Sequence, residues 1–241
     1  MARIKRQKQE IGLPRIGKIK VGELVERNGK TFPQSLDYFR ATGKYASHFH
    51  KVYGDKPNQI TIVFVTDNLD VACDEEYHLR DKAGGLYGRG DGETFRIWNG
   101  EIEDYVTATT SDYPNLMDQA EKKSKSPQGW QAVLTLRFII PTIPGVVGMW
   151  ELQTKGERSS LPQIRDAFDF VRDWAGTVVN IPFNLTVEKV KSQRPGSKSK
   201  FPVIQLIPNV TKENMEMVRN ALSDGYDVKE VKQLLSNNEE Q

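Results

Sequence analysis

Alternation of apolar and polar residues along the chain predicts that β-strands make up most of the fold. Residues 16–25 alternate imperfectly and lead to Asn28-Gly29, a dipeptide typical of two-residue hairpin turns. Residues 60–65 are β-branched and almost continuously apolar, which predicts a strand buried on both faces. Three shorter strands separated by glycine-containing turns follow, and we expect them to form an antiparallel meander over residues 76–80, 86–89 and 94–98.

The second half of the chain carries two further pairs of strand patterns. Residues 132–140 and 146–153 predict two core strands separated by a proline-rich connection. Residues 178–190 and 201–207 predict a β-hairpin, because Pro195-Gly196 between them is a turn signal.

Apolar residues spaced three and four apart predict helices in two places before residue 210. The clearest helix covers residues 161–175, where Ser159 or Ser160 can cap the first turn and Gly176 can end the last. Residues 36–53 carry similar spacings and predict one or two short helices.

The remaining segments are polar and set the expected domain limits. Residues 1–12 predict a flexible basic arm, and residues 110–130 predict a long loop. Residues 13–210 then form the core domain, and residues 211–241 form a helical hairpin whose first helix is capped by Thr211. We therefore expect an α+β fold with a mostly antiparallel sheet, one long packing helix, a projecting basic hairpin and this C-terminal appendage.

The formal net charge of +2 conceals a strong segregation of charge. Residues 1–20 carry +6 and residues 189–200 carry +5, so the rest of the chain carries −9. Two basic segments on an acidic body suggest an anionic partner, of which nucleic acid is the commonest. A solvated arm and a solvated loop explain the same pattern equally well. The candidate nucleic-acid contacts in these segments are Arg3, Lys5, Arg6, Lys8, Arg15, Lys18, Lys189, Lys191, Arg194, Lys198 and Lys200.

Residue types that carry catalysis are sparse. Cys73 is the only cysteine, which excludes an intrachain disulfide and a cysteine zinc site. The glycine-rich stretch 84–92 lacks the lysine and serine of a phosphate-binding loop. An enzyme would have to use Asp91, Glu93 and a histidine, a weak constellation. We therefore expect no catalytic residue, no metal and no cofactor.

The apolar segments are too short to predict a membrane span or a signal peptide. No apolar run approaches the roughly 18 residues that span a bilayer, and the basic N-terminus lacks an apolar stretch behind it. We expect a cytoplasmic protein without a membrane partner.

Several phrases of the sequence stand out together: Leu13–Ile19, Tyr53–Pro57 leading into Ile60–Phe64, Arg89–Glu93, and Phe138–Ser160 with its Met-Trp-Glu-Leu-Gln-Thr run. In this order and spacing they resemble the phage recombination directionality factors that work with large serine integrases. The resemblance implies a non-enzymatic phage protein of the bacterial host cell. It implies that the protein binds a serine integrase on attachment-site DNA and favours excision. The oligomeric state is left open.

The resemblance breaks down before residues 132–140, where relatives often carry a cysteine cluster. This chain has Glu121-Lys122-Lys123-Ser124-Lys125-Ser126 there, which leaves a basic loop in place of any implied zinc site. Lys122, Lys123 and Lys125 therefore join the candidate nucleic-acid contacts. The alternative function is a single-stranded or non-specific nucleic-acid-binding protein of replication or recombination.

Overall fold

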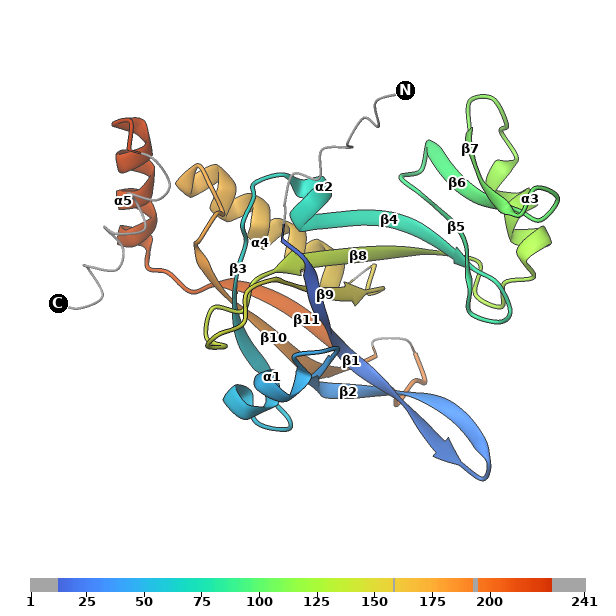
Figure 1. The fold of residues 1–241 in the computed structure, drawn as a ribbon, viewed down its shortest axis with the longest axis horizontal. Coiled ribbons are helices and arrows are strands. Elements are labelled where there is room, and N and C mark those ends of the chain that lie inside the picture. Colours follow the sequence, from blue (N-terminus) through green and yellow to red (C-terminus); the bar gives the residue numbers. More distant parts are fainter. Residues whose placement is uncertain (1–12, 158, 193–194, 227–241) are drawn as a thin grey trace, which may run out of the picture.

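Two β-sheets, with helices packed around them, form the protein (Figure 1). A computed structural model describes residues 13–157, 159–192 and 195–226. In chain order the elements are β1 (Arg15–Arg27), β2 (Lys30–Thr42), α1 (Ala46–Tyr53), β3 (Gln59–Val63), α2 (Leu69–Ala72), β4 (Cys73–Arg80), β5 (Leu86–Gly90), β6 (Thr94–Asn99), β7 (Asp104–Thr109), α3 (Leu116–Ser124), β8 (Trp130–Phe138), β9 (Met149–Thr154), α4 (Ser160–Ala175), β10 (Pro182–Lys191), β11 (Lys200–Pro208) and α5 (Lys212–Ser223). The α+β class is as the sequence predicted.

The larger sheet has eight strands in the order β2-β1-β9-β8-β4-β5-β6-β7. Its neighbouring strands are antiparallel except β1 and β9, which run parallel. Strands β4 to β6 form the predicted meander, and β7 extends it by one strand. The β1–β2 turn is the predicted one: Asn28 and Gly29 have φ values of 53° and 70°, the left-handed backbone that this kind of turn requires.

The smaller sheet has three strands in the order β11-β10-β3. Strands β10 and β11 form the predicted hairpin, paired from Phe183 opposite Pro208 to Lys191 opposite Lys200. Strand β3 was predicted to be buried on both faces, which is wrong. Ile60 and Ile62 are buried, but Thr61 and Val63, which alternate with them, are only half-buried.

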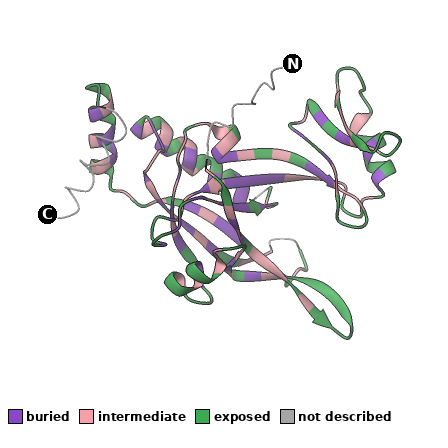
Figure 2. Cartoon of the chain, in the orientation of Figure 1, coloured by how far each residue is buried: buried purple, intermediate pink, exposed green. Residues whose placement is uncertain are grey.

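The main core joins residues of both sheets with helices α4 and α5 (Figure 2). One face of α4 is buried, and the Phe168 ring on it packs 5.1 Å from that of Phe64, centroid to centroid. Gly176 ends the helix in a left-handed conformation, as predicted. A second, smaller core holds Leu79 and Phe95 beneath α3. Burial of each such side chain contributes about 1.5–3 kcal/mol.

Residues 36–42 are a strand rather than the first part of a helix. Lys20 pairs with Arg40, but Gly22 pairs with Ser35, so β2 carries extra residues at this point. At this irregularity the buried residues Leu36 and Phe39 are three positions apart, a spacing that imitates a helix. The second half of the predicted segment is helical, as α1.

The predicted loop over residues 110–130 contains helix α3. Its sequence is mostly polar, and the helix forms where Leu116, Met117 and Ala120 pack against the second core. The indole of Trp130 donates a hydrogen bond to the Met117 carbonyl, at 3.1 Å, and ties the helix to β8. Tertiary contacts therefore stabilise a helix that local propensity leaves weak.

The chain ends agree with the sequence as far as they are described. The Thr211 side chain accepts a hydrogen bond from the Asn214 backbone N–H and caps α5, as predicted. The predicted arm 1–12 and the second helix of the C-terminal hairpin lie outside the described residues. Among the described helices, none has the length and apolar character needed to cross a membrane.

Candidate functional site: a cationic groove on the larger sheet

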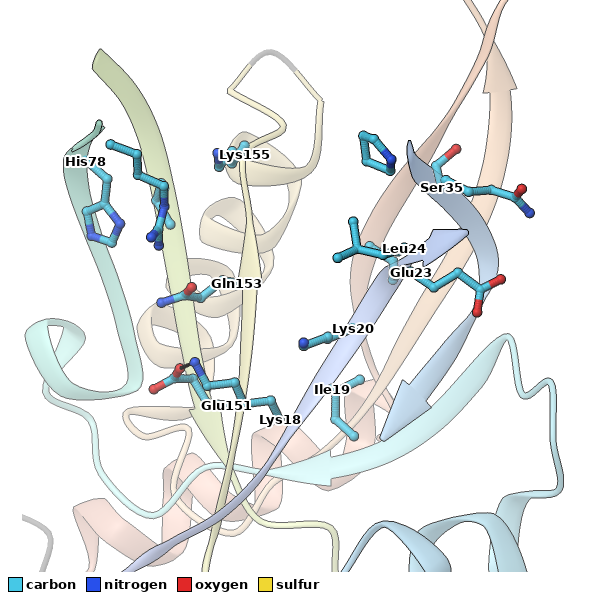
Figure 3. Close-up of a pocket in the computed structure, with 16 residues that line it drawn as sticks. Lys18, Ile19, Lys20, Glu23, Leu24, Ser35, His78, Glu151, Gln153 and Lys155 are labelled. Atoms are coloured by element: carbon cyan, nitrogen blue, oxygen red, sulfur yellow. Dashed lines mark ion pairs between the residues drawn. The ribbon is translucent and has the colours of Figure 1, made fainter. Parts of the chain in front are cut away.

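A groove of about 780 Å³ lies on the face of the larger sheet opposite the main core (Figure 3). Strands β1, β9 and β8 line its floor, and the β1–β2 hairpin and β4 line its two sides. Figure 3 shows Lys20 and Leu24 on the hairpin side, His78 on the β4 side, and Gln153 and Lys155 between them. The groove is therefore assembled from strands that are distant in sequence and adjacent in the sheet.

Strand alternation explains which side chains reach the groove. On β1, Ile19 borders the groove but is buried in the main core, whereas Lys18 and Lys20 alternate with it and line the groove on the other face. On β9, Trp150 and Leu152 belong to the core, and Glu151 and Gln153, which alternate with them, line the groove. The pairing of β1 with β2 is irregular between Lys20 and Gly22. Such irregularities increase the local twist of a strand pair, and beyond this point the β1–β2 hairpin forms one side of the groove.

Glu151 is the buried carboxylate of the groove floor. Its side chain is 8% exposed and makes two ion pairs, each at 3.2 Å, with the Arg15 guanidinium and the Lys18 ammonium. The two cations are 58% and 42% exposed. One carboxylate thus balances only one of these two positive charges.

Three further cations line the groove without a carboxylate partner among the described residues: Lys20, Arg80 and Lys155. Arg80 donates a hydrogen bond to the Gly84 carbonyl at 3.0 Å, which orients the guanidinium and leaves its charge unbalanced. Burial, and secondarily repulsion by Arg80, lowers the pKa of the Lys155 ammonium. The other acid of the lining, Glu23, is paired with Arg40 at 2.9 Å. The groove is therefore net positive.

His78 lines the β4 side of the groove and pairs with Glu76, which lies outside the lining. His78 is buried, and its Nε2 lies 3.3 Å from a Glu76 carboxylate oxygen. This hydrogen bond, helped by Arg89, lowers the pKa of Glu76 against the opposing effect of burial. The Nδ1 atom of His78 is buried and has no hydrogen-bond partner among the described residues. The β4 side is polar and partly desolvated, which strengthens any interaction with a charged ligand.

The structure places the predicted site residues in separate regions. Arg15 and Lys18 both pair with Glu151, but only Lys18 lines the groove, and Arg15 lies outside its lining. The lysines of the predicted basic loop lie instead at the end of α3, with Lys125 in a left-handed conformation after its last turn. Exposed lysines of the β10–β11 hairpin and its tip form a third group: Lys189, Lys191, Lys198 and Lys200. The remaining candidates lie outside the described residues: Arg3, Lys5, Arg6, Lys8 and Arg194.

Sequence reasoning missed Lys20, Arg80 and Lys155 as members of one site. The sequence pattern could have identified Lys20. Lys18 and Lys20 lie on either side of the apolar Ile19, so a strand places both lysines on the same face. Arg80 and Lys155 are 75 residues apart in the chain, and only the pairing of β4, β8 and β9 brings them together. No local pattern marks them.

Asp91, which was considered for catalysis, has a structural role. The Asp91 carboxylate accepts backbone hydrogen bonds from Thr94 and Glu93, at 2.8 and 2.9 Å, and these lower its pKa. It stabilises the β5–β6 turn. Burial raises the pKa of the Cys73 thiol to about 12. Within the described ranges, no three His, Cys, Asp or Glu side chains are grouped to hold a metal ion.

Comparison with known proteins supplies the family. Residues 16–209 match the family model of Gp3-like proteins, described as recombination directionality factor-like. The match covers most of the chain, and the protein belongs to this family. Membership indicates a role in phage recombination, with an integrase and DNA as the general partners. Searches of curated proteins and of solved structures each gave no match.

Proposed function

We propose that this protein is a non-enzymatic directionality factor that binds a serine integrase on attachment-site DNA and favours excision. The observation that carries the proposal is the family match, which spans residues 16–209 and so takes in nearly all of both sheets and the groove. A groove rich in cations and poor in catalytic groups is consistent with a factor that acts by binding.

The mechanism is a population shift of the integrase. A bound protein redirects a reaction only when it binds one arrangement of its partner more tightly than another. About 5.5 kcal/mol of differential binding converts a 1:99 preference into 99:1. A protein interface of ordinary size, roughly 1,600 Å², is sufficient for such a difference. The factor then needs no chemistry of its own.

DNA is a secondary ligand in this proposal. The exposed lysines of the β10–β11 hairpin contact phosphates of the attachment site and help to hold the factor on the integrase complex. Phosphate contacts of this kind release counterions, so they weaken as salt rises. They position the protein without reading sequence.

The decisive experiment is a recombination assay with the purified protein and a co-resident serine integrase. The substrates are the two hybrid sites that integration leaves, and separately the two original sites. We expect the integrase alone to recombine only the original sites. Addition of the protein should permit recombination of the hybrid sites and reduce that of the original ones. No change in either reaction, with every co-resident integrase, would refute the proposal.

One observation favours a second candidate, a single-stranded nucleic-acid-binding protein. Phe201 is 39% exposed beside Lys200 on the basic hairpin, an arrangement on which a base can stack. This candidate requires tight binding of a single-stranded oligonucleotide by the protein alone. Replacement of Phe201 by alanine should then weaken binding roughly tenfold, since base stacking contributes about 1–3 kcal/mol. A directionality factor should show weak oligonucleotide binding that this change leaves unaltered.

A further inference from the structure

We infer that the cationic groove is the docking site for an acidic segment of the integrase whose carboxylates alternate with apolar side chains. The inference rests on the proposed function and adds to it the surface and the chemistry of the contact.

The charges of the groove favour an anionic occupant. Lys20, Arg80 and Lys155 have no carboxylate partner among the described residues, and Glu151 balances only one of its two cations. Repulsion by Arg80 contributes to the lowered pKa of Lys155. An arriving carboxylate would relieve this repulsion between like charges.

The apolar parts of the lining favour a polypeptide over a nucleic acid. Leu24 is 72% exposed and lies with Pro33 and Val21 on the hairpin side of the groove. Apolar side chains of a peptide would bury this surface, whereas a phosphate backbone gains nothing from it. The volume of about 780 Å³ lies within the range of 300–1,000 Å³ typical of ligand pockets and holds a few side chains.

The test compares two variants with the same change of charge. The groove variant is Lys20→Glu with Lys155→Glu. The control variant is Lys44→Glu with Lys51→Glu, two exposed lysines just before and within α1, outside the groove. Affinity for the purified co-resident serine integrase is measured by calorimetry without DNA. We expect the groove variant to lose at least tenfold in affinity and the control variant to lose less than twofold.

Two further measurements guard against a misfolded variant. Lys155→Arg keeps the charge and should keep the affinity of the wild type. Hydrogen exchange on the wild-type complex should show protection in β1 and β9, the floor of the groove, with no substitution needed.

The outcomes separate the inference from the proposed function. If the wild type binds integrase and promotes excision but the groove variant binds equally well, the inference alone is wrong. If the groove variant keeps integrase affinity and loses binding to a 30-base-pair duplex, the groove is a phosphate site and the inference is overturned. If the wild type does not bind integrase at all, both are refuted.

Discussion

Replacement of Glu151 by glutamine should lower the stability of the fold and raise the affinity of the groove for an acidic partner. Glu151 is buried on the groove floor and forms ion pairs with both Arg15 and Lys18. The amide keeps the size and shape of the side chain and can still accept hydrogen bonds, but it removes the negative charge. The two cations are left without a counter-charge, and the groove gains one unit of positive charge.

The expected loss of stability is about 1–2 kcal/mol. Removing one member of a fully buried ion pair costs about 3–5 kcal/mol, because the remaining charge stays desolvated. Exposed pairs contribute only about 0–1 kcal/mol each. Here the carboxylate is buried, whereas the cations are 58% and 42% exposed and can be hydrated again, so the cost falls between these limits. For a chain of 241 residues this corresponds to a fall in Tm of about 3–6 °C.

The expected gain in affinity is about fivefold. One additional unbalanced charge, at a partly solvated site and physiological salt, adds roughly 1 kcal/mol of attraction for a carboxylate. Stability is measured by thermal and urea unfolding, and affinity by calorimetry with the integrase. Lys51→Met, which removes an exposed charge from α1, should change neither quantity by more than about 0.5 kcal/mol. Unchanged stability, or an affinity that falls, would contradict this account of the groove.

Three further changes test the core and the thiol. Phe168→Ala removes a fully buried ring beside Phe64 and should cost about 3–5 kcal/mol in urea unfolding; a loss below 1 kcal/mol would show that α4 is not packed as described. Gly17→Ala would place a Cβ against the Trp150 ring and 2.8 Å from the Thr42 carbonyl oxygen, so both must shift and the free energy of unfolding should fall by about 1–3 kcal/mol; unchanged near-ultraviolet circular dichroism would argue against this contact. Because burial raises the pKa of Cys73 to about 12, iodoacetamide at pH 8 should label this thiol only after urea unfolding, as measured by mass spectrometry; rapid labelling of the native protein would refute its burial. Because the pKa of this thiol is higher in the native state, folding favours its neutral form. The native state therefore loses stability as the pH rises above about 9, where the thiol of the unfolded chain ionises.

The errors in the predicted fold have a common physical origin. Residues 36–42 imitate a helix because an irregularity in β2 changes the spacing of buried side chains from two to three. Helix α3 was predicted as a loop because its sequence is mostly polar. The helix is stabilised by packing against Leu79 and Phe95, which lie on other elements and leave no pattern in its own sequence. In both places, contacts made across the fold outweigh the local pattern.

By itself, the sequence determined the α+β class, the β4–β6 meander, helix α4 with its glycine stop, and the basic β10–β11 hairpin. These features depend on periodicity, turn residues and capping, which act over a few residues and are visible in the chain itself. The ordered phrases between residues 13 and 208 also carried the family, which the match over residues 16–209 confirms.

Only the tertiary structure decided where the candidate site lies. The groove takes its cations from β1, β4 and the end of β9, and its apolar side from the β1–β2 hairpin. Lys20 and Lys155 are 135 residues apart in the chain, and the parallel pairing of β1 with β9 brings their strands together. The basic runs in the sequence predicted contacts on the β10–β11 hairpin and at α3, because the residues of each run are neighbours in the chain. The cations of the groove are distant in the chain and become neighbours only through the order of the strands in the sheet, which no local pattern encodes.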